Sequence, residues 1–159
     1  MANMCSFQMI IKGEKPDRDG FINALTQKGR CCMGRGAEIS ESFENENDVR
    51  IYGWCKWSVA SALYDNAFSM REQKNTGKGR WYNKDGFINN HIFVDLVEAT
   101  EIGNLDVEVV SWESGMCFSE HYHIRNGKVL TWETTEYTEI WDEETGELIR
   151  EEGGFKPLW

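Results

Sequence analysis

The sequence has little of several residues that would mark it as one particular class of protein. Among 159 residues there are only two prolines, three histidines and five cysteines, and no C-x-x-C pair occurs. Neither a disulfide framework nor a zinc ribbon fits that cysteine spacing. No apolar run approaches the roughly 20 residues of a membrane-spanning helix, and the N-terminus has no secretory signal pattern. We therefore expect a cytoplasmic protein with reduced thiols and with no metal, cofactor or membrane contact.

The sequence does contain enough apolar material for a folded core. Hydrophobic residues make up 40% of the chain and charged residues 28%, which argues against disorder. A chain of this length is expected to form one domain, so we predict a single domain over residues 1–159. Within it we distinguish a core, residues 1–130, from an acidic hairpin extension, residues 131–159.

The negative charge is concentrated near the C-terminal end. The chain has 17 basic and 27 acidic residues, which gives a formal net charge of −10. Residues 133–152 hold nine of the acids and one base, Arg150, so this segment carries −8. The rest of the chain carries only −2 and is nearly neutral. This balance argues against nucleic acid as a partner of the whole surface, because binding to phosphates requires a basic footprint.

Patterns of strand and helix alternate along the first half of the chain. Apolar residues recur at every second position or at helical spacing, which distinguishes the two kinds of element. The cluster Asn45-Glu46-Asn47-Asp48 is rich in turn residues and predicts a hairpin, and Ser58 is a suitable N-cap for a helix. The predicted elements are strands over 5–11, 38–44 and 49–57 and helices over 16–29 and 59–70.

The second half of the chain begins with a helix and continues as an antiparallel meander. Gly103-Asn104 is placed to end the helix, and Asn126-Gly127 is the strongest two-residue hairpin signal in the sequence. The predicted elements are a helix over 92–101 and strands over 105–109, 117–125, 128–141 and 147–150.

This order of elements predicts an α+β fold. A β-α-β-β-α-β core with short connections, an antiparallel sheet and helices on one face accounts for it, extended by C-terminal β-hairpins. That core is ferredoxin-like in topology only, since no cysteine run for an iron–sulfur cluster is present.

Three stretches of sequence also resemble a known family. They are residues 1–6 (MANMCS), residues 53–58 (GWCKWS) and residues 113–122 (ESGMCFSEHY), the last followed by Asn126-Gly127. In these stretches the chain resembles the YubB-like family, which comprises small proteins with a ferredoxin-like domain encoded largely on phages, plasmids and bacterial chromosomes. The resemblance covers residues 1–130. It implies a ferredoxin-like fold and an association with mobile elements, but no established activity.

Two histidines on one predicted strand are the first candidate site. His121 and His123 are two residues apart, so both point to one face, roughly 6.6 Å apart along the strand. Cys117 is predicted on the same face but about 13 Å from His121, too far to share one tetrahedral metal site. A small enzyme using His121, His123 or Cys117 is therefore the last-ranked hypothesis, and we predict no catalytic residue and no metal ligand.

A short basic stretch is the second candidate site. Residues 71–85 contain five bases and two acids, with Trp81 and Tyr82 among them. Alternating aromatic and basic residues are typical of single-stranded nucleic-acid sites, so Arg80, Trp81 and Lys84 are candidates for such a contact. The simpler interpretation, which we favour, is a surface loop whose Trp81 packs on the core.

The acidic segment is the third candidate site. Trp132, Tyr137 and Trp141 alternate with its acids, and aromatic residues are favoured anchors at protein interfaces. The segment is suited to binding a basic partner or to imitating the phosphates of DNA. Alternatively, it serves as a charged edge that prevents strand pairing, or the aromatics fasten it to its own domain or to a second copy. We also expect the aromatic C-terminus, Phe155 to Trp159, to dock on the domain.

The sequence thus predicts a small, non-enzymatic protein-binding module associated with mobile elements. Its expected partner is an unidentified protein, with a homodimer as one form, and its expected interface is the acidic hairpin together with the sheet surface. The alternatives are a nucleic-acid-linked role, through the 71–85 loop or through DNA mimicry, and a small enzyme. The candidate binding residues are Trp54, Lys56, Trp57, Arg80, Trp81, His121, His123, Trp132, Tyr137 and Trp141.

Overall fold

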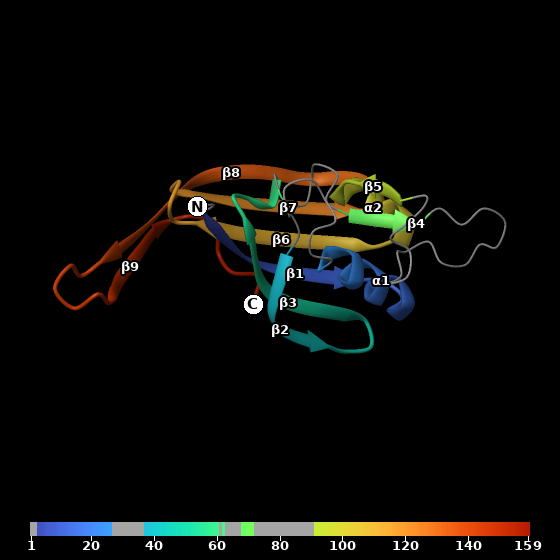
Figure 1. Cartoon of the computed structure of the whole chain (residues 1–159), viewed down its shortest axis with the longest axis horizontal. Coiled ribbons are helices and arrows are strands. Elements are labelled where there is room, and N and C mark those ends of the chain that lie inside the picture. The colour runs from blue at the N-terminus through green and yellow to red at the C-terminus, as the bar shows by residue number, and fades with distance from the viewer. Residues whose placement is uncertain (1–2, 27–36, 61, 63–67, 72–90) are drawn as a thin grey trace.

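The computed structural model describes residues 3–26, 37–60, 62, 68–71 and 91–159 of the chain. Seven strands form one sheet in the order β2-β3-β1-β6-β7-β8-β9, and every neighbouring pair is antiparallel (Figure 1). A separate hairpin pairs β4 with β5. The elements are β1 (Met4–Lys12), α1 (Lys15–Leu25), β2 (Ala37–Glu44), β3 (Asp48–Lys56), β4 (Phe68–Arg71), β5 (His91–Val94), α2 (Leu96–Gly103), β6 (Asp106–Glu113), β7 (Phe118–Arg125), β8 (Lys128–Trp141) and β9 (Leu148–Gly153).

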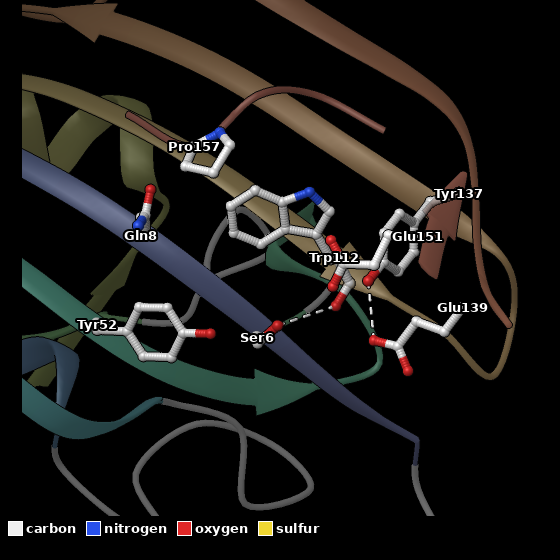
Figure 2. Close-up of a pocket in the computed structure, with 8 residues that line it drawn as sticks. All are labelled: Ser6, Gln8, Tyr52, Trp112, Tyr137, Glu139, Glu151 and Pro157. Atoms are coloured by element: carbon white, nitrogen blue, oxygen red, sulfur yellow. Dashed lines mark hydrogen bonds between the residues drawn. The ribbon is translucent and has the colours of Figure 1, made fainter. Parts of the chain in front are cut away.

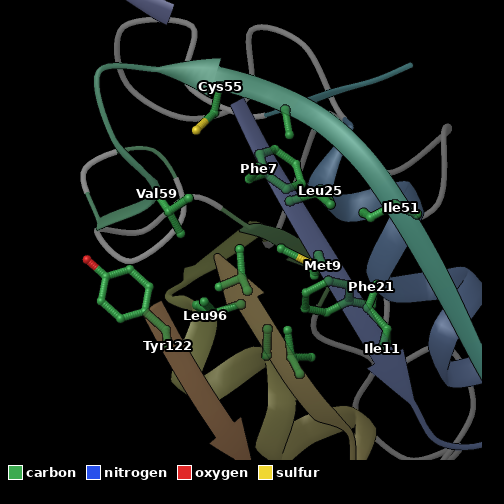
Figure 3. Close-up of a cluster of buried hydrophobic side chains, with 14 of the residues drawn as sticks. Phe7, Met9, Ile11, Phe21, Leu25, Ile51, Cys55, Val59, Leu96 and Tyr122 are labelled. Atoms are coloured by element: carbon green, nitrogen blue, oxygen red, sulfur yellow. The ribbon is translucent and has the colours of Figure 1, made fainter. Parts of the chain in front are cut away.

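The hydrophobic core lies between one face of the sheet and the two helices α1 and α2. Alternate side chains of the central strands point to this inner face, as the period of two in their sequences predicts. Helix α1 contributes Phe21 and Leu25, and helix α2 contributes Leu96 and Ala99 (Figure 3). All four of these helical side chains are fully buried, so both helices pack on the inner face of the sheet, with α2 next to β7.

Helix α1 is fastened to the turn between β2 and β3 by a buried arginine. Pro16 lies in the first turn of the helix, where its missing N–H is tolerated, and the helix ends at Leu25. Arg18 donates from Nη1 to the carbonyl oxygen of Asn45, 3.1 Å away, and from Nη2 to that of Glu46, 3.5 Å away. The side chain of Asn45 in turn accepts the backbone N–H groups of residues 47 and 48. The predicted hairpin around residues 45–48 is thereby confirmed.

Local signals also set the end of α2 and the turn before β8. Asp95 caps α2, since its side chain accepts the N–H of Glu98 at 2.8 Å. Asn104 has φ 50° and ψ 50° and ends the helix in the left-handed conformation, where the sequence predicts the end. Asn126 and Gly127 have φ values of 45° and 78°, as a two-residue type I′ turn requires. Both predicted turn positions are therefore confirmed.

The predicted ferredoxin-like α+β core is wrong. The structure is mainly one curled antiparallel sheet, and β7, β8 and β9 continue that sheet through unbroken strand pairing. The described residues form only two helical elements, α1 and α2. The prediction limited the core sheet to four strands with appended hairpins. It did so because the order of elements along the chain does not specify how many strands join one sheet.

All three predicted helices are also shorter than expected, and α1 ends at Leu25 instead of residue 29. The helix expected over 59–70 begins with a helical turn, in which Ala62 N–H donates to the Ser58 oxygen at 2.9 Å. Its expected end is instead extended, since Phe68–Arg71 pairs with His91–Val94. The same pairing delays the next helix from residue 92 to Leu96. Short apolar runs fit either a helix or a strand, and here strand pairing decides between them.

No helix among the described residues combines the length and the apolar character needed to cross a bilayer. The expected cytoplasmic location stays a prediction.

The close approach of β2 and β3 leaves no room for a side chain at Gly53. A Cβ added there would lie 2.4 Å from the backbone oxygen of Glu38 and 3.1 Å from the Phe7 ring. We expect Gly53→Ala to lower the free energy of unfolding by about 1–3 kcal/mol, measured by urea denaturation, because a backbone oxygen cannot give way as a side chain can. Gly146→Ala is the control, since nothing lies within 4 Å of its Cβ position and only its positive φ is strained. An equal loss in both variants would contradict the steric explanation.

Candidate functional site

The C-terminal segment, residues 154–159, lies across the outer face of the sheet, the face turned away from α1 and α2. Three side chains of the sheet hold its backbone, in addition to the hydrogen bond from the N–H of Gly154 to the backbone oxygen of Glu136 at 2.8 Å. Trp112 Nε1 donates to the oxygen of Phe155 at 3.0 Å, the N–H of Phe155 donates to Ser119 Oγ at 3.0 Å, and the N–H of Leu158 donates to Gln8 Oε1 at 2.7 Å. The guanidinium of Arg50 lies 5.9 Å from the ring centroid of Trp159. The expected docking of the aromatic C-terminus is therefore confirmed.

A pocket opens where this segment meets the β8–β9 hairpin and the outer face. Its volume is about 190 Å³. Figure 2 shows the lining side chains, with the indole of Trp112 among them and the phenol of Tyr137 directed at Glu139. We call it the acidic–aromatic pocket, and its lining residues are Ser6, Gln8, Tyr52, Trp112, Tyr137, Glu139, Glu151 and Pro157.

The electrostatics of the acidic–aromatic pocket are negative. None of its lining residues is basic, and two are glutamates. Tyr137 is only 2% exposed, and its hydroxyl donates to Glu139 Oε1 at 2.8 Å. Burial, then the hydrogen bond with Glu139 and the charges of Glu139 and Glu151, raise the pKa of Tyr137 far above its usual value. The phenol therefore stays neutral and keeps donating to the carboxylate.

The β8–β9 hairpin, residues 137–153, extends beyond the end of the sheet (Figure 1). Trp141 and Leu148 are register partners, and both are exposed, at 51% and 42%. Ile149 is also exposed, at 59%. Arg150, the single base within residues 133–152, donates from Nε to Glu152 at 2.8 Å. Exposed apolar side chains therefore lie among acids, and the one local base is already paired with one of them.

The two predicted histidines lie on the outer face, each beside an acid of β6. His121 Nε2 is 3.0 Å from Glu108 Oε2, and His123 Nε2 is 2.8 Å from Asp106 Oδ1. The ring of Phe155 lies 5.5 Å from that of His121. Neither histidine lines the acidic–aromatic pocket or the shallow pocket at Thr26, Ala37, Glu38 and Ile39. The outer face therefore holds both histidines in pairs with carboxylates.

The structure does not bring Cys117 to the histidines. It was expected on the same strand, but β7 begins at Phe118, and Cys117 has φ 61° and is exposed in the preceding turn. Within the described ranges, no group of three or more histidine, cysteine or acidic side chains is arranged to hold a metal ion.

The remaining sequence candidates are distributed over different parts of the sheet. Trp54 donates from Nε1 to Glu38 Oε2 at 2.9 Å, and Lys56 ends β3 in an exposed position. Trp57 leaves the strand with φ 69° and is exposed. Trp132 stacks on Tyr122, with ring centroids 3.5 Å apart, and so belongs to the inner face.

The candidates of the basic stretch, Arg80, Trp81 and Lys84, lie outside the described residues. A contact with single-stranded nucleic acid through these residues therefore stays a prediction. Of the candidate residues that the structure describes, only Tyr137 lines the acidic–aromatic pocket.

Sequence reasoning missed a buried carboxylate on the inner face. Glu120 of β7 is 2% exposed and accepts the N–H of Val59 at 2.8 Å and that of Ala60 at 3.1 Å. It also accepts the hydroxyl of Ser111 at 2.8 Å and the hydroxyl of Tyr122. The signal in the sequence is its position two residues before Tyr122, in phase with the buried side chains of that strand.

Two thiols adjoin this buried carboxylate. Cys5 and Cys55 are buried register partners on β1 and β3, and both are free thiols. Cys5 Sγ lies 3.9 Å from Glu120 Oε1. Hydrogen bonding with Cys5 and burial both raise the pKa of the Cys55 thiol. Such a thiol is protonated and inert, so this cluster stabilises the fold and does not form a nucleophilic site.

Comparison with models of protein families, with curated proteins and with solved structures finds no match. The resemblance to the YubB-like family therefore stays a prediction.

The contacts of Glu120 predict a large effect of removing its charge. We expect Glu120→Gln to lower the free energy of unfolding by about 2–4 kcal/mol in urea denaturation, since the amide –NH₂ cannot accept the donors that the carboxylate satisfies. Glu136→Gln is the control, because Glu136 lies on β8 with an exposed side chain. Similar stability of the two variants would show that the buried carboxylate is dispensable.

The contacts of Asp106 predict a pH dependence. Burial raises the pKa of Asp106, but hydrogen bonds with Arg125 and His123 lower it by more, so it lies below its usual value. A carboxyl with a lowered folded-state pKa stabilises the fold above its unfolded pKa of about 3.9 and loses this contribution as the pH falls further. We expect the wild type to lose more stability than Asp106→Asn between about pH 5 and pH 2, measured by urea unfolding at each pH. Glu143→Gln is the charge-matched control and should lose stability with falling pH as the wild type does. If the free energy of unfolding of Asp106→Asn fell with pH in parallel with that of the wild type, the prediction would be contradicted.

Proposed function

We propose that the protein is a non-enzymatic binding module whose β8–β9 hairpin binds a basic protein partner. The observation that carries this proposal is the set of exposed apolar side chains on the hairpin, Trp141, Leu148 and Ile149, placed among acids. Exposed aromatic and aliphatic side chains grouped on one projecting element are typical anchors of protein interfaces. The acids around them favour a partner surface of opposite charge.

The charge of the hairpin supports a foreign partner over a second copy of the chain. Residues 133–152 carry −8, and Arg150 already pairs with Glu152. Two such hairpins brought together would repel each other, because like charges in close contact are unfavourable. Strand β9 is also the last strand of the sheet. All of its residues are exposed and three of the six are charged, a pattern that discourages strand pairing between copies.

The arrangement gives little support to catalysis. The histidines that an enzyme would use are paired with Glu108 and Asp106 on an open sheet face, away from the acidic–aromatic pocket. Cys117 lies apart in a turn. A nucleophile, a base and a stabilising group are therefore not brought together by these residues, and binding is the function that we propose.

A synthetic peptide tests this proposal. The probe is a fluorescein-labelled 12-residue peptide of alternating arginine and leucine, and its control replaces every arginine with glutamate. We expect saturable binding of the arginine peptide that weakens as salt is raised, and no binding of the glutamate peptide, in fluorescence anisotropy. We expect Trp141→Ser to weaken binding about tenfold or more, because truncating a central aromatic anchor costs about 2 kcal/mol.

Val129→Ser is the matched control for that variant. Val129 is a similarly exposed apolar residue of β8, but it lies at the other end of the strand from the hairpin. Its substitution should leave peptide binding unchanged, and both variants should keep the wild-type melting temperature. Equal binding by wild type and Trp141→Ser, or equal binding of both peptides, would overturn the proposal.

A further inference from the structure

We propose that the acidic–aromatic pocket receives one arginine side chain of the partner. This inference rests on the proposed function, because it names the residue that the hairpin's partner would insert. It assigns a ligand class to a cavity that the hairpin's exposed anchors, Trp141, Leu148 and Ile149, do not line.

The position and size of the pocket fit a single side chain. Its walls come from β1, β3, β6, β8, β9 and the C-terminal segment, so it lies where the hairpin leaves the sheet (Figure 2). Its volume of about 190 Å³ is below the roughly 300–1,000 Å³ of typical small-molecule pockets. A partner bound along the hairpin would therefore pass the pocket and could place one extended side chain in it.

The chemistry of the walls selects a cation. Glu139 and Glu151 come from the paired strands β8 and β9, and no lining residue is basic. A neutral apolar occupant would remove water from both carboxylates and return no compensating interaction, and an anion would be repelled. The raised pKa of Tyr137, to which both glutamate charges contribute, agrees with a negative potential at this point.

The aromatic residues of the pocket favour a guanidinium over an ammonium. Tyr52 and Trp112 line the pocket together with the two glutamates, whereas the ring of Tyr137 is buried. A planar guanidinium stacks on an aromatic face and offers a fork of N–H donors to carboxylate oxygens, whereas an ammonium is a compact and strongly hydrated charge. An arginine can therefore use both kinds of wall at the same time.

The pocket is held ready for this ligand by existing contacts. The hydroxyl of Tyr137 fixes the carboxylate of Glu139 through a bond of 2.8 Å. Pro157 forms its wall between two anchored residues, Phe155 on Ser119 and Leu158 on Gln8. Groups that are ordered before binding lose little freedom when the ligand arrives, which improves affinity.

The test uses amino-acid amides as probes with the full chain. Nα-acetyl-arginine amide, the lysine analogue and the neutral citrulline analogue are titrated against ¹⁵N-labelled protein. We expect saturable shifts at Ser6, Gln8 and Glu151 with the arginine probe, at a Kd on the order of millimolar. The lysine probe should bind at least about threefold more weakly, and the citrulline probe should not saturate.

Two variants separate the pocket from the general acidity of the hairpin. Glu151→Gln should weaken binding of the arginine probe at least about fivefold. Glu147→Gln removes an exposed acid of the turn that does not line the pocket, and it should leave that binding unchanged. Equal effects of the two variants, binding of citrulline equal to that of arginine, or equal binding of lysine would each overturn the inference.

The 12-residue arginine peptide distinguishes failure of this inference from failure of the hairpin proposal. Peptide binding that depends on Trp141, combined with no shift from the arginine probe, overturns the pocket assignment and leaves the hairpin as the interface. Peptide binding that is indifferent to Trp141→Ser overturns the hairpin proposal, and with it the assignment of the arginine to a partner on that hairpin.

Discussion

The buried carboxylate of Glu120 joins parts of the chain that are distant in sequence. It accepts backbone N–H groups from Val59 and Ala60 and hydroxyls from Ser111 and Tyr122, so it ties β6 and β7 to the chain that follows β3. A buried charge is tolerated only with such a set of donors. Because side chains alternate along a strand, fixing Glu120 and Tyr122 inward also fixes His121 and His123 outward. The inner face thereby determines which side chains lie on the outer face.

The outer face is organised by the C-terminal segment, which lies across the strands instead of joining the sheet as another strand. Its contacts with Ser119, Trp112 and Gln8 reach β7, β6 and β1 in turn. The segment covers part of the outer face and leaves the acidic–aromatic pocket beside it. The acids of the β8–β9 hairpin therefore have two roles in the structure: some face solvent around exposed apolar anchors, and Glu139 and Glu151 form part of a defined wall.

Local signals in the sequence predicted local structure well, and non-local pairing was the limit. The turns at residues 45–48, 104 and 126–127 follow from asparagine and glycine chemistry that acts over a few residues. The hairpin turn at Asn126-Gly127 likewise indicated that β7 pairs with β8, whereas the pairing of residues 68–71 with 91–94 depends on partners that no local pattern identifies. The sequence could not predict the acidic–aromatic pocket for the same reason. Its walls form only when β8 and β9 pair in the observed register and Pro157 returns to the neighbourhood of β1. The sequence identified Tyr137 as a candidate binding residue because it lies among acids. That its phenol is buried and neutral follows from packing, which the sequence pattern does not show.

The contact between Gln8 and Leu158 joins residues 150 positions apart. Such a contact forms only after the intervening strands have paired, since closing a long loop costs entropy that earlier contacts must first offset. During synthesis the core strands leave the ribosome before residue 157 does, so the sheet can pair before the last wall of the pocket is in place. A chain that stops short of Pro157 keeps every residue of the hydrophobic core and loses that wall of the pocket. The pocket is therefore the last part of the structure to be completed as the chain is synthesised and folds.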